Sequence, residues 1–369
     1  MSSSLAGEVL EHDAADLFGL TAALVAVPSE SHHEAELAGI VARRLRDRAP
    51  SLAIDVVGES VVARTRLGRD RRVVLGGHLD TVPANGNDVP RIDGDVLHGL
   101  GSADMKGGLA VLLALAEALD ADPGSARHDV TLAFYECEEV ADTFNGLRRI
   151  FEERAELLDA DLAVLLEPTG GAVEAGCQGV VVLEARFVGE RAHTARPWMG
   201  RNAIHRASEV LARLARHESD VVEVDGLEYR ESLQVVRIEG GIAGKFNVVP
   251  DGCTFAVGRR FAPRYDEAEA INQVRVLLDG ADDVEVLQSQ PAAPPNLAHP
   301  LVAEFVSSTG LPVRSKLGWT DVARFASRGV PAVNFGPGDP EIAHTAGEHV
   351  TRASIEQAYA TLAGFVGVG

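Results

Sequence analysis

Histidine and carboxylate residues follow one another along the chain in short motifs, and each motif adjoins a segment with the composition of a strand or of a glycine-rich turn. The motifs are His78-Leu79-Asp80, Gly101-Ser102-Ala103-Asp104, Glu138-Glu139, Glu167-Pro168 and His344. Imidazole nitrogen and carboxylate oxygen are the donors that hold zinc at catalytic centres. Two histidines and three of these five carboxylates brought together would suit a centre of two metal ions that activates water for hydrolysis.

His78 ends a β-rich run, and Asp80 lies two positions later. Side chains in a strand repeat every two positions, so both residues point to the same face. Asp80 is then placed to accept the second ring proton of His78 and to fix the tautomer that binds metal. The alternative is a His-x-Asp tripeptide in an ordinary turn.

The carboxylates come from three further segments. Asp104 lies in a glycine-rich stretch before a helix, where it can bridge two metals or serve as a helix N-cap. Glu138 and Glu139 follow an apolar strand and point in different directions, so one can bind metal while the other acts as general base. Elsewhere such a pair is usually two exposed acids. Glu167 closes an apolar strand, where a charge needs a partner.

The segments between these motifs alternate between helix and strand. Helices are predicted at 13–27, 106–119 and 144–156, and strands at 53–57, 60–65, 72–77, 130–135 and 161–166. The stretch Ser31-His32-His33-Glu34 has the pattern of a capping box, which predicts a helix through Arg46. This alternation predicts an α/β fold with a mixed, largely parallel sheet covered by helices, and ligands bind beyond the carboxyl ends of its strands.

From about Val180 the order changes to strand, helix, strand, strand, helix, strand. The predicted ranges are 180–188, 202–216, 232–239, 245–257, 266–278 and 284–287. This is the order of a ferredoxin-like α+β unit. A proline-rich linker at 290–295 returns the chain to a final α/β stretch. We therefore expect a discontinuous catalytic domain of residues 1–178 and 293–369, interrupted by an inserted domain of residues 179–292.

Composition limits the class of protein. A net charge of −21 over 369 residues argues against a nucleic-acid surface, which needs clustered lysine and arginine. The three cysteines, Cys137, Cys177 and Cys253, lack the spacing of a zinc site and fit free thiols of a reducing compartment. The apolar stretch at 20–27 is too short to span a bilayer. These features predict a cytoplasmic protein with no membrane partner.

Taken together, the motifs resemble those of the zinc aminoacylase and carboxypeptidase family of co-catalytic metallopeptidases, and the resemblance extends from about Asp16 to Val366. It implies two zinc ions per subunit, with cobalt or manganese as substitutes. It also implies a role for each residue: His78 and Glu167 bind one ion, Glu139 and His344 bind the other, Asp104 bridges them, Asp80 orients His78, and Glu138 is the general base and later the acid.

The segment Gly189 to Pro197 resembles the lid motif of the same family, whose histidine reaches the active site of the other subunit of a dimer. The resemblance therefore implies a homodimer formed through the inserted domain, with the strand 180–188 and the helix 202–216 as the pairing surface. It makes His193 a further catalytic residue that holds the oxyanion. Judged on its own, a histidine at a strand end is more often a surface or capping residue.

Arg260, Asn247 and Thr320 are the substrate-binding residues that the resemblance implies. An arginine fork matches a carboxylate. The segment Gly318-Trp319-Thr320-Asp321 departs from the usual family pattern, because Trp319 replaces a small residue.

The substrate implied is a small N-acyl amino acid. The resemblance is strongest to members that cleave N-succinyl-LL-2,6-diaminopimelate to succinate and LL-2,6-diaminopimelate, a step toward lysine and peptidoglycan. Acetylornithine deacetylase, aminoacylase and dipeptidase activities use the same metal motifs and are the alternatives. A non-enzymatic, metal-binding regulatory protein is a more remote alternative, and it predicts loss of the general base, whereas Glu138 is present.

Overall fold

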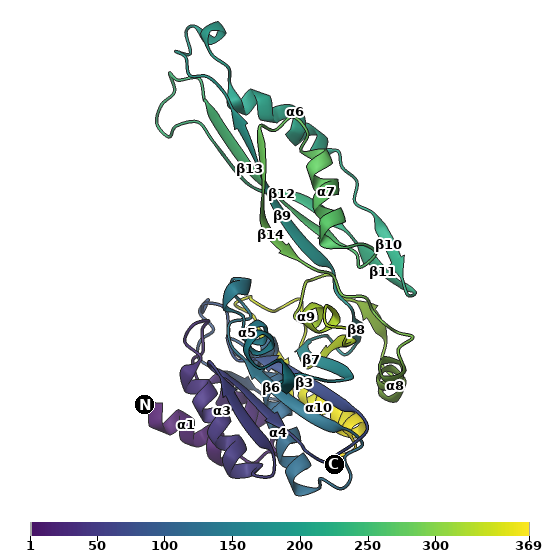
Figure 1. Cartoon of the computed structure of the whole chain (residues 1–369). Coiled ribbons are helices and arrows are strands. Elements are labelled where there is room, and N and C mark those ends of the chain that lie inside the picture. Colours follow the sequence, from purple (N-terminus) through teal and green to yellow (C-terminus); the bar gives the residue numbers. More distant parts are fainter. Residues whose placement is uncertain (1, 369) are drawn as a thin grey trace. The chain divides into compact units, whose positions relative to one another are not determined.

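The computed structural model describes the backbone of residues 2–368 and the side chains of residues 6–368. The chain divides into two compact units (Figure 1). The first comprises the chain up to Ala175, Asn296–Arg314 and the chain from Arg324 onward; the second comprises Gly176–Pro295 and Ser315–Ala323. The sequence placed boundaries at 178/179 and 292/293 and assigned the short segment Ser315–Ala323 to the catalytic part.

An eight-stranded sheet forms the centre of the first unit, with the order β1-β2-β6-β3-β7-β16-β8-β15. The strands are β1 (Ala53–Val57), β2 (Ser60–Arg64), β3 (Arg72–His78), β6 (Asp129–Tyr135), β7 (Leu162–Pro168), β8 (Val173–Ala175), β15 (Val313–Ser315) and β16 (Ala332–Gly336). The central neighbours β6, β3, β7 and β16 are parallel, while β1, β2 and β8 pair in antiparallel fashion. The predicted α/β class with a mixed, largely parallel sheet is confirmed.

Helices cover this sheet. They are α1 (Ser2–Glu11), α2 (Leu17–Val25), α3 (Ala35–Arg48), α4 (Gly107–Ala121), α5 (Gly146–Glu153), α8 (Pro300–Thr309) and α10 (Arg352–Val366), and α9 (Val322–Ala326) lies where the chain re-enters the unit. The helix α4 is apolar on almost every side and is buried among α2, α3, α10 and the sheet. The stretch 83–99 contains a hairpin of β4 (Arg91–Asp93) and β5 (Val96–His98), and β5 pairs with β17 (His349–Thr351).

The predicted capping box is wrong. The helix α3 begins at Ala35, and Glu34 precedes it in a helical conformation without a side-chain hydrogen bond to the helix. The side chains of Ser31 and Glu34 instead bind groups far along the chain. These side chains therefore form tertiary hydrogen bonds instead of capping the helix.

The second unit is a four-stranded antiparallel sheet with two helices on one face (Figure 1). Its elements follow in the order β9 (Gly179–Val188), α6 (Ala203–Ala215), β12 (Ser232–Gly240), β13 (Gly252–Phe261), α7 (Glu267–Leu277) and β14 (Asp283–Gln290). Phe187 and Phe255 stack at the centre of its core, between the helices and the sheet. The predicted ferredoxin-like order is confirmed; a hairpin of β10 (Val221–Val224) and β11 (Leu227–Arg230) is additional.

Two details of the second unit differ from the predictions. The strand predicted at 245–257 begins only at Gly252, and the residues before it form a loop in which Gly241 and Gly244 adopt positive φ angles. The predicted pairing surface is wrong for the strand 180–188. The sheet order is β12-β13-β9-β14, so both edges of β9 are already bonded within the chain and the edge strands are β12 and β14.

Among residues 2–368, no helix combines the length and the apolar character that a membrane span requires.

Candidate metal centre

Side chains from separate segments meet at the carboxyl ends of β3, β6 and β7. Three sets of residues each offer ligand atoms within 4.8 Å of one another: His78, Asp104 and Glu167; His78, Glu138 and Glu139; and Asp104, Glu139 and His344. The structure therefore brings the five predicted ligands and the predicted base into one cluster. Parallel strands bring them together because their carboxyl ends lie at the same edge of the sheet.

Two glycines make room for the segment that carries Asp104. A Cβ atom on Gly77 would lie 2.5 Å from the Cε atom of Met105, and one on Gly108 would lie 2.9 Å from it. The buried Met105 side chain consequently packs against β3, and the backbone N–H of His78 lies 3.3 Å from its sulfur. This packing places the neighbouring Asp104 beside His78.

Asp104 lies between the two histidines. Its Oδ1 atom is 3.0 Å from Nε2 of His78, and its Oδ2 atom is 3.3 Å from Nε2 of His344. Nε2 of His344 is also 2.8 Å from Oε1 of Glu139. A carboxylate whose two oxygens face different imidazoles can bridge two ions, and nitrogen with oxygen donors suits zinc. The residues present therefore fit a dinuclear metal site.

The charges of the cluster depend on one another. Burial alone would raise the pKa of Asp104, but hydrogen bonds with His344 and His78 outweigh it and hold the pKa well below its usual range. The hydrogen bonds with Asp104 and Glu139 raise the pKa of His344 to about 10. Burial opposes a charge on His78, yet its bond with Asp104 raises its pKa well above the ordinary value. Metal binding must therefore displace protons from both imidazoles.

The two halves of the cluster differ in exposure. The side chain of His78 is 1% exposed, and Glu167 is 6% exposed. The side chain of His344 is 50% exposed, whereas that of Glu139 is 9% exposed. The half formed by His344 is thus the side that solvent and a small molecule can reach.

Asp80 contacts His78 through its main chain more closely than through its carboxylate. Nδ1 of His78 is 2.9 Å from the carbonyl oxygen of Asp80 and 3.5 Å from Oδ1. The carbonyl thus accepts the ring proton and fixes the tautomer. The Asp80 carboxylate accepts the backbone N–H groups of Glu138 and Glu139, at 2.9 and 3.0 Å. Burial of the Asp80 carboxylate would raise its pKa, but the adjacent His78 ring and these N–H groups outweigh burial and lower it.

Glu348 supports the backbone of Asp104, and Lys106 binds the same segment to Val27; neither was predicted as a site residue. Oε1 of Glu348 accepts the N–H groups of Ala103 and Asp104 at 3.0 and 3.1 Å, and its side chain is buried. Lys106 is 2% exposed, its Nζ donates to the carbonyl oxygen of Val27 at 2.6 Å, and burial lowers its pKa to about 7. Glu348 lies four residues after His344, and no motif in the sequence marks it.

The other predicted site residues belong to the second unit. His193 is exposed and forms a β-bridge with Val248, beside the exposed Asn247. Thr320 is buried, and its carbonyl oxygen is 3.8 Å from the sulfur of Cys177. Arg260 is half-buried, burial lowers its pKa, and no carboxylate forms an ion pair with it in the part of the chain that the structure describes.

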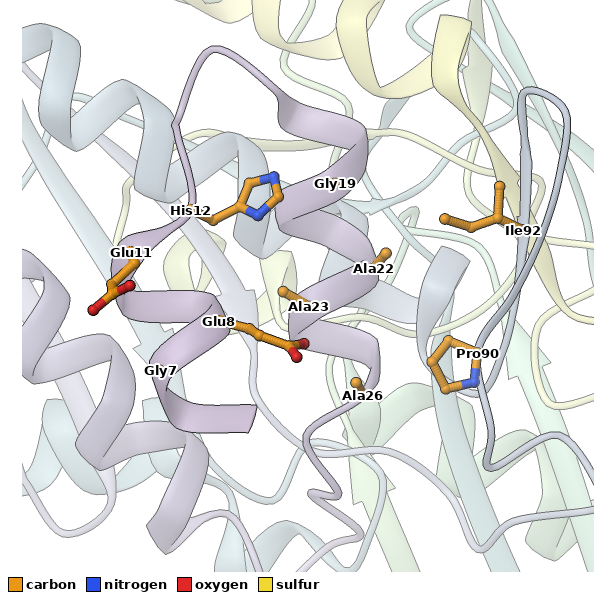
Figure 2. Close-up of a pocket in the computed structure, with 10 residues that line it drawn as sticks. All are labelled: Gly7, Glu8, Glu11, His12, Gly19, Ala22, Ala23, Ala26, Pro90 and Ile92. Atoms are coloured by element: carbon orange, nitrogen blue, oxygen red, sulfur yellow. The ribbon is translucent and has the colours of Figure 1, made fainter. Parts of the chain in front are cut away.

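A separate pocket of about 830 Å³ lies at the first two helices (Figure 2). Half of its lining residues are glycine or alanine, among them Ala22 and Ala23 of α2 and Ala26 just after that helix; Glu8 of α1, Ile92 of β4 and Pro90 also line it. None of the predicted ligands lines it. The predicted ligands lie instead at the carboxyl end of the sheet.

Fold and cluster together define a metal-dependent hydrolase with a catalytic α/β unit and a second, ferredoxin-like unit. Residues 74–367 match the peptidase family M20/M25/M40, and the chain belongs to that family. Family membership and the cluster of imidazoles and carboxylates together indicate metal binding at this site.

Curated relatives match along almost the whole chain. The DapE protein of Mycobacterium tuberculosis is 47% identical over 353 residues, covering 95% of this chain and 98% of its own. The succinyl-diaminopimelate desuccinylase of Corynebacterium glutamicum is 43% identical over 339 residues, covering 89% and 91%. Among solved structures, the aminopeptidase PepT of Bacillus cereus has a TM-score of 0.79 at 20% identity, covering 96% and 98%, and it shares the fold.

Proposed function

We propose that the protein is a dinuclear-zinc amidohydrolase that cleaves N-succinyl-LL-2,6-diaminopimelate to succinate and LL-2,6-diaminopimelate, a cytoplasmic step toward lysine and peptidoglycan. The observation that carries the metal chemistry is the carboxylate of Asp104, with one oxygen toward each of two histidines. The choice of substrate is supported by the 43% identity to the desuccinylase of Corynebacterium glutamicum.

In this proposal His78 and Glu167 hold one ion, Glu139 and His344 hold the other, and Asp104 holds both. Two zinc ions, when bound, lower the pKa of water and polarise the amide carbonyl, and cobalt or manganese can substitute for zinc.

Glu138 removes the proton from the attacking water and then delivers it to the leaving amine. It is suited to this role because its backbone N–H is fixed by Asp80, while the neighbouring Glu139 supplies the contact with His344. His193 stabilises the developing oxyanion, a contribution of about 2.7–4 kcal/mol for a donor of this kind.

Substrate recognition is assigned to the second unit. Arg260 is a half-buried cation without a carboxylate partner among residues 2–368, which suits it to bind a carboxylate of the succinyl or diaminopimelate group. Asn247, which adjoins the bridge between His193 and Val248, and Thr320 complete the proposed contacts.

We further propose that the protein is a homodimer that forms through the second unit, and that His193 acts in the active site of the partner subunit. The edge strand β12 supports this assembly, because its Val236 and Ile238 are 63% and 53% exposed and its outer edge is not bonded within the sheet. If the protein is a monomer in solution and the His193→Ala variant keeps full activity, the role in trans is contradicted.

The direct test measures succinate release from N-succinyl-LL-2,6-diaminopimelate by the zinc-loaded protein, beside N-acetylornithine and a dipeptide. We expect preferred cleavage of the succinyl substrate and a loss of about 10²–10⁴-fold in kcat for Glu138→Ala, because a general base contributes this much. Bound zinc should be unchanged in that variant. Cleavage of another amide alone would move the protein to a sibling activity, and cleavage of none would favour a binding protein.

A further inference from the structure

The segment 29–34, here called the strap, is hydrogen-bonded to the residues that directly follow β3, the strand that ends in His78. The hydroxyl of Ser29 donates to the carbonyl oxygen of Leu79 at 2.7 Å. Two backbone hydrogen bonds add to this contact. Ser31 N–H donates to the carbonyl oxygen of Thr81 at 3.1 Å, and Thr81 N–H donates to the carbonyl oxygen of Ser29 at 2.9 Å. The strap is therefore fixed against the same turn that contains Asp80.

The strap also contacts the loop after β6. Three consecutive backbone N–H groups of this loop donate hydrogen bonds to two buried carboxylates. The N–H of Cys137 donates to Oε1 of Glu34 at 3.0 Å, and those of Glu138 and Glu139 donate to the two oxygens of Asp80. The hydroxyl of Ser31 donates to Oδ2 of Asp80 at 2.7 Å. Glu34 and Asp80 are both 0% exposed.

The loop needs this support because it turns sharply at Cys137. The φ angle of Cys137 is +55°, in the left-handed region that residues with side chains rarely adopt. Oε1 of Glu34 lies within bonding distance of both the Cys137 N–H and its sulfur, the latter at 3.3 Å. The turn determines where the next two side chains, the predicted base and a predicted ligand, point.

Burying the carboxylate of Glu34 costs free energy of folding. Its Oε2 atom is buried and has no hydrogen-bond partner among the residues that the structure describes, and burying such a group destabilises a fold. Glu34 does not cap α3 through its side chain. Within residues 2–368, the hydrogen bonds of its side chain all go to Cys137.

We propose that Ser31 and Glu34 are positioning residues of the active site: they hold the backbone of Cys137–Glu139 so that Glu139 reaches the metal cluster and Glu138 faces the attacking water. Glu34 acts directly on the turn at Cys137, and Ser31 acts through the carboxylate of Asp80. The proposal rests on the roles proposed above for Glu138 and Glu139.

The test compares Glu34→Ala, Glu34→Gln and Ser31→Ala in the full chain. Zinc is titrated calorimetrically into the metal-free protein, the visible spectrum of the cobalt-loaded protein is recorded, and kcat and KM are measured. For Glu34→Ala we expect a 10–100-fold weaker affinity for at least one zinc ion, an altered cobalt spectrum, and a lower kcat with little change in KM. Glu34→Gln keeps an acceptor oxygen and should recover most of the loss. Ser31→Ala should show a smaller loss in the same readouts.

Asp129→Ala is the matched control, because Asp129 is also a buried carboxylate that accepts backbone N–H groups, at the opposite end of β6. It should lose stability and keep the affinity for zinc and the cobalt spectrum. Wild-type affinity and spectrum in Glu34→Ala, or an equal loss of affinity in Asp129→Ala, would overturn the proposal.

Two further outcomes remain decisive. If Glu34→Ala does not fold, Ser31→Ala decides by the same measurements, and an unchanged zinc affinity and spectrum in that variant would refute the proposal. If the zinc-loaded wild type cleaves no amide, the proposed function fails, yet the zinc titration and the cobalt spectrum still test whether the strap positions the cluster.

Discussion

Acidic residues lie at both edges of the sheet where the parallel strands β3, β6 and β7 begin and end, but the partners of these acids differ. At the amino ends, Asp161 accepts from Arg71 at 2.8 Å and from the backbone N–H of Arg72 at 2.9 Å. Asp129 accepts from Thr65 and from two backbone N–H groups. At the carboxyl ends, Asp104 and Glu139 form their ion pairs with histidines.

The difference shows how one sheet separates stability from function. A guanidinium keeps its proton at any physiological pH, so the acids at the amino ends have permanent partners. An imidazole can give up its proton to make room for a metal ion, so the acids at the carboxyl ends have exchangeable partners. Substitutions at the two ends should therefore change different properties of the protein.

The largest effect is expected at Asp104. Asp104→Asn removes the carboxylate that faces both histidines, and we expect zinc affinity to fall by more than about 100-fold, beyond the range seen for residues that only support a ligand. The measurement is calorimetric titration of the metal-free protein with zinc, with protein-bound metal counted after dialysis. Two tightly bound ions in the variant would contradict the bridging role.

Asp129→Ala should act on stability alone. It leaves the hydroxyl of Thr65 and the N–H groups of Leu67 and Arg69 without their acceptor, and we expect a loss of about 1–3 kcal/mol in the free energy of unfolding. Urea unfolding of the metal-free protein measures it. A fall in zinc affinity of comparable size would break the separation between the two ends of the sheet.

The contribution of Asp129 should also depend on pH. Burial would raise its pKa, but the N–H of Leu67, the hydroxyl of Thr65 and other donors outweigh burial, so its folded pKa is lowered. A lowered pKa stabilises the folded state above the unfolded value of about 3.9, and this stabilisation is lost as the pH falls through the folded value. The difference in unfolding free energy between wild type and Asp129→Asn should be constant near neutral pH and shrink below about pH 4. A difference that grows on acidification would contradict this sign.

The smallest effect is expected at Arg71. Its ion pair with Asp161 is open to solvent, with side chains 57% and 32% exposed. Arg71→Ala should therefore cost no more than about 1 kcal/mol, and less at high salt. Thermal unfolding at two salt concentrations checks this, and a large loss that is independent of salt would show that the pair is not simply a surface contact.

The sequence was most informative where chemistry and periodicity coincided. His78, Glu138, Glu139 and Glu167 follow apolar strands, and parallel strands carry such residues to one edge of the sheet, so their meeting could be predicted from spacing. The ferredoxin-like order of the second unit was equally visible in the alternation of its segments. Both features depend on local patterns and on general rules of topology.

Features that depend on tertiary partners were missed. Ser31 and Glu34 satisfy a local capping pattern, and only the fold reveals that they bind Asp80 and Cys137. The apolar strand 180–188 reads the same whether it lies at an edge or inside a sheet, so its interior position could not be seen. Glu348 was overlooked because a lone glutamate after a histidine carries no distinctive spacing.

The short segment Ser315–Ala323 has a consequence for protein engineering. It belongs to the second unit although the sequence returns to the first unit at Asn296, so the chain passes from one unit to the other four times. If Gly176–Pro295 alone were exchanged for the equivalent part of a relative, Ser315–Ala323 with Thr320 would stay unchanged. That segment would then face replaced residues of the second unit. A chimera designed to alter substrate range therefore needs two grafts made together, and a single graft would carry a mismatched internal interface.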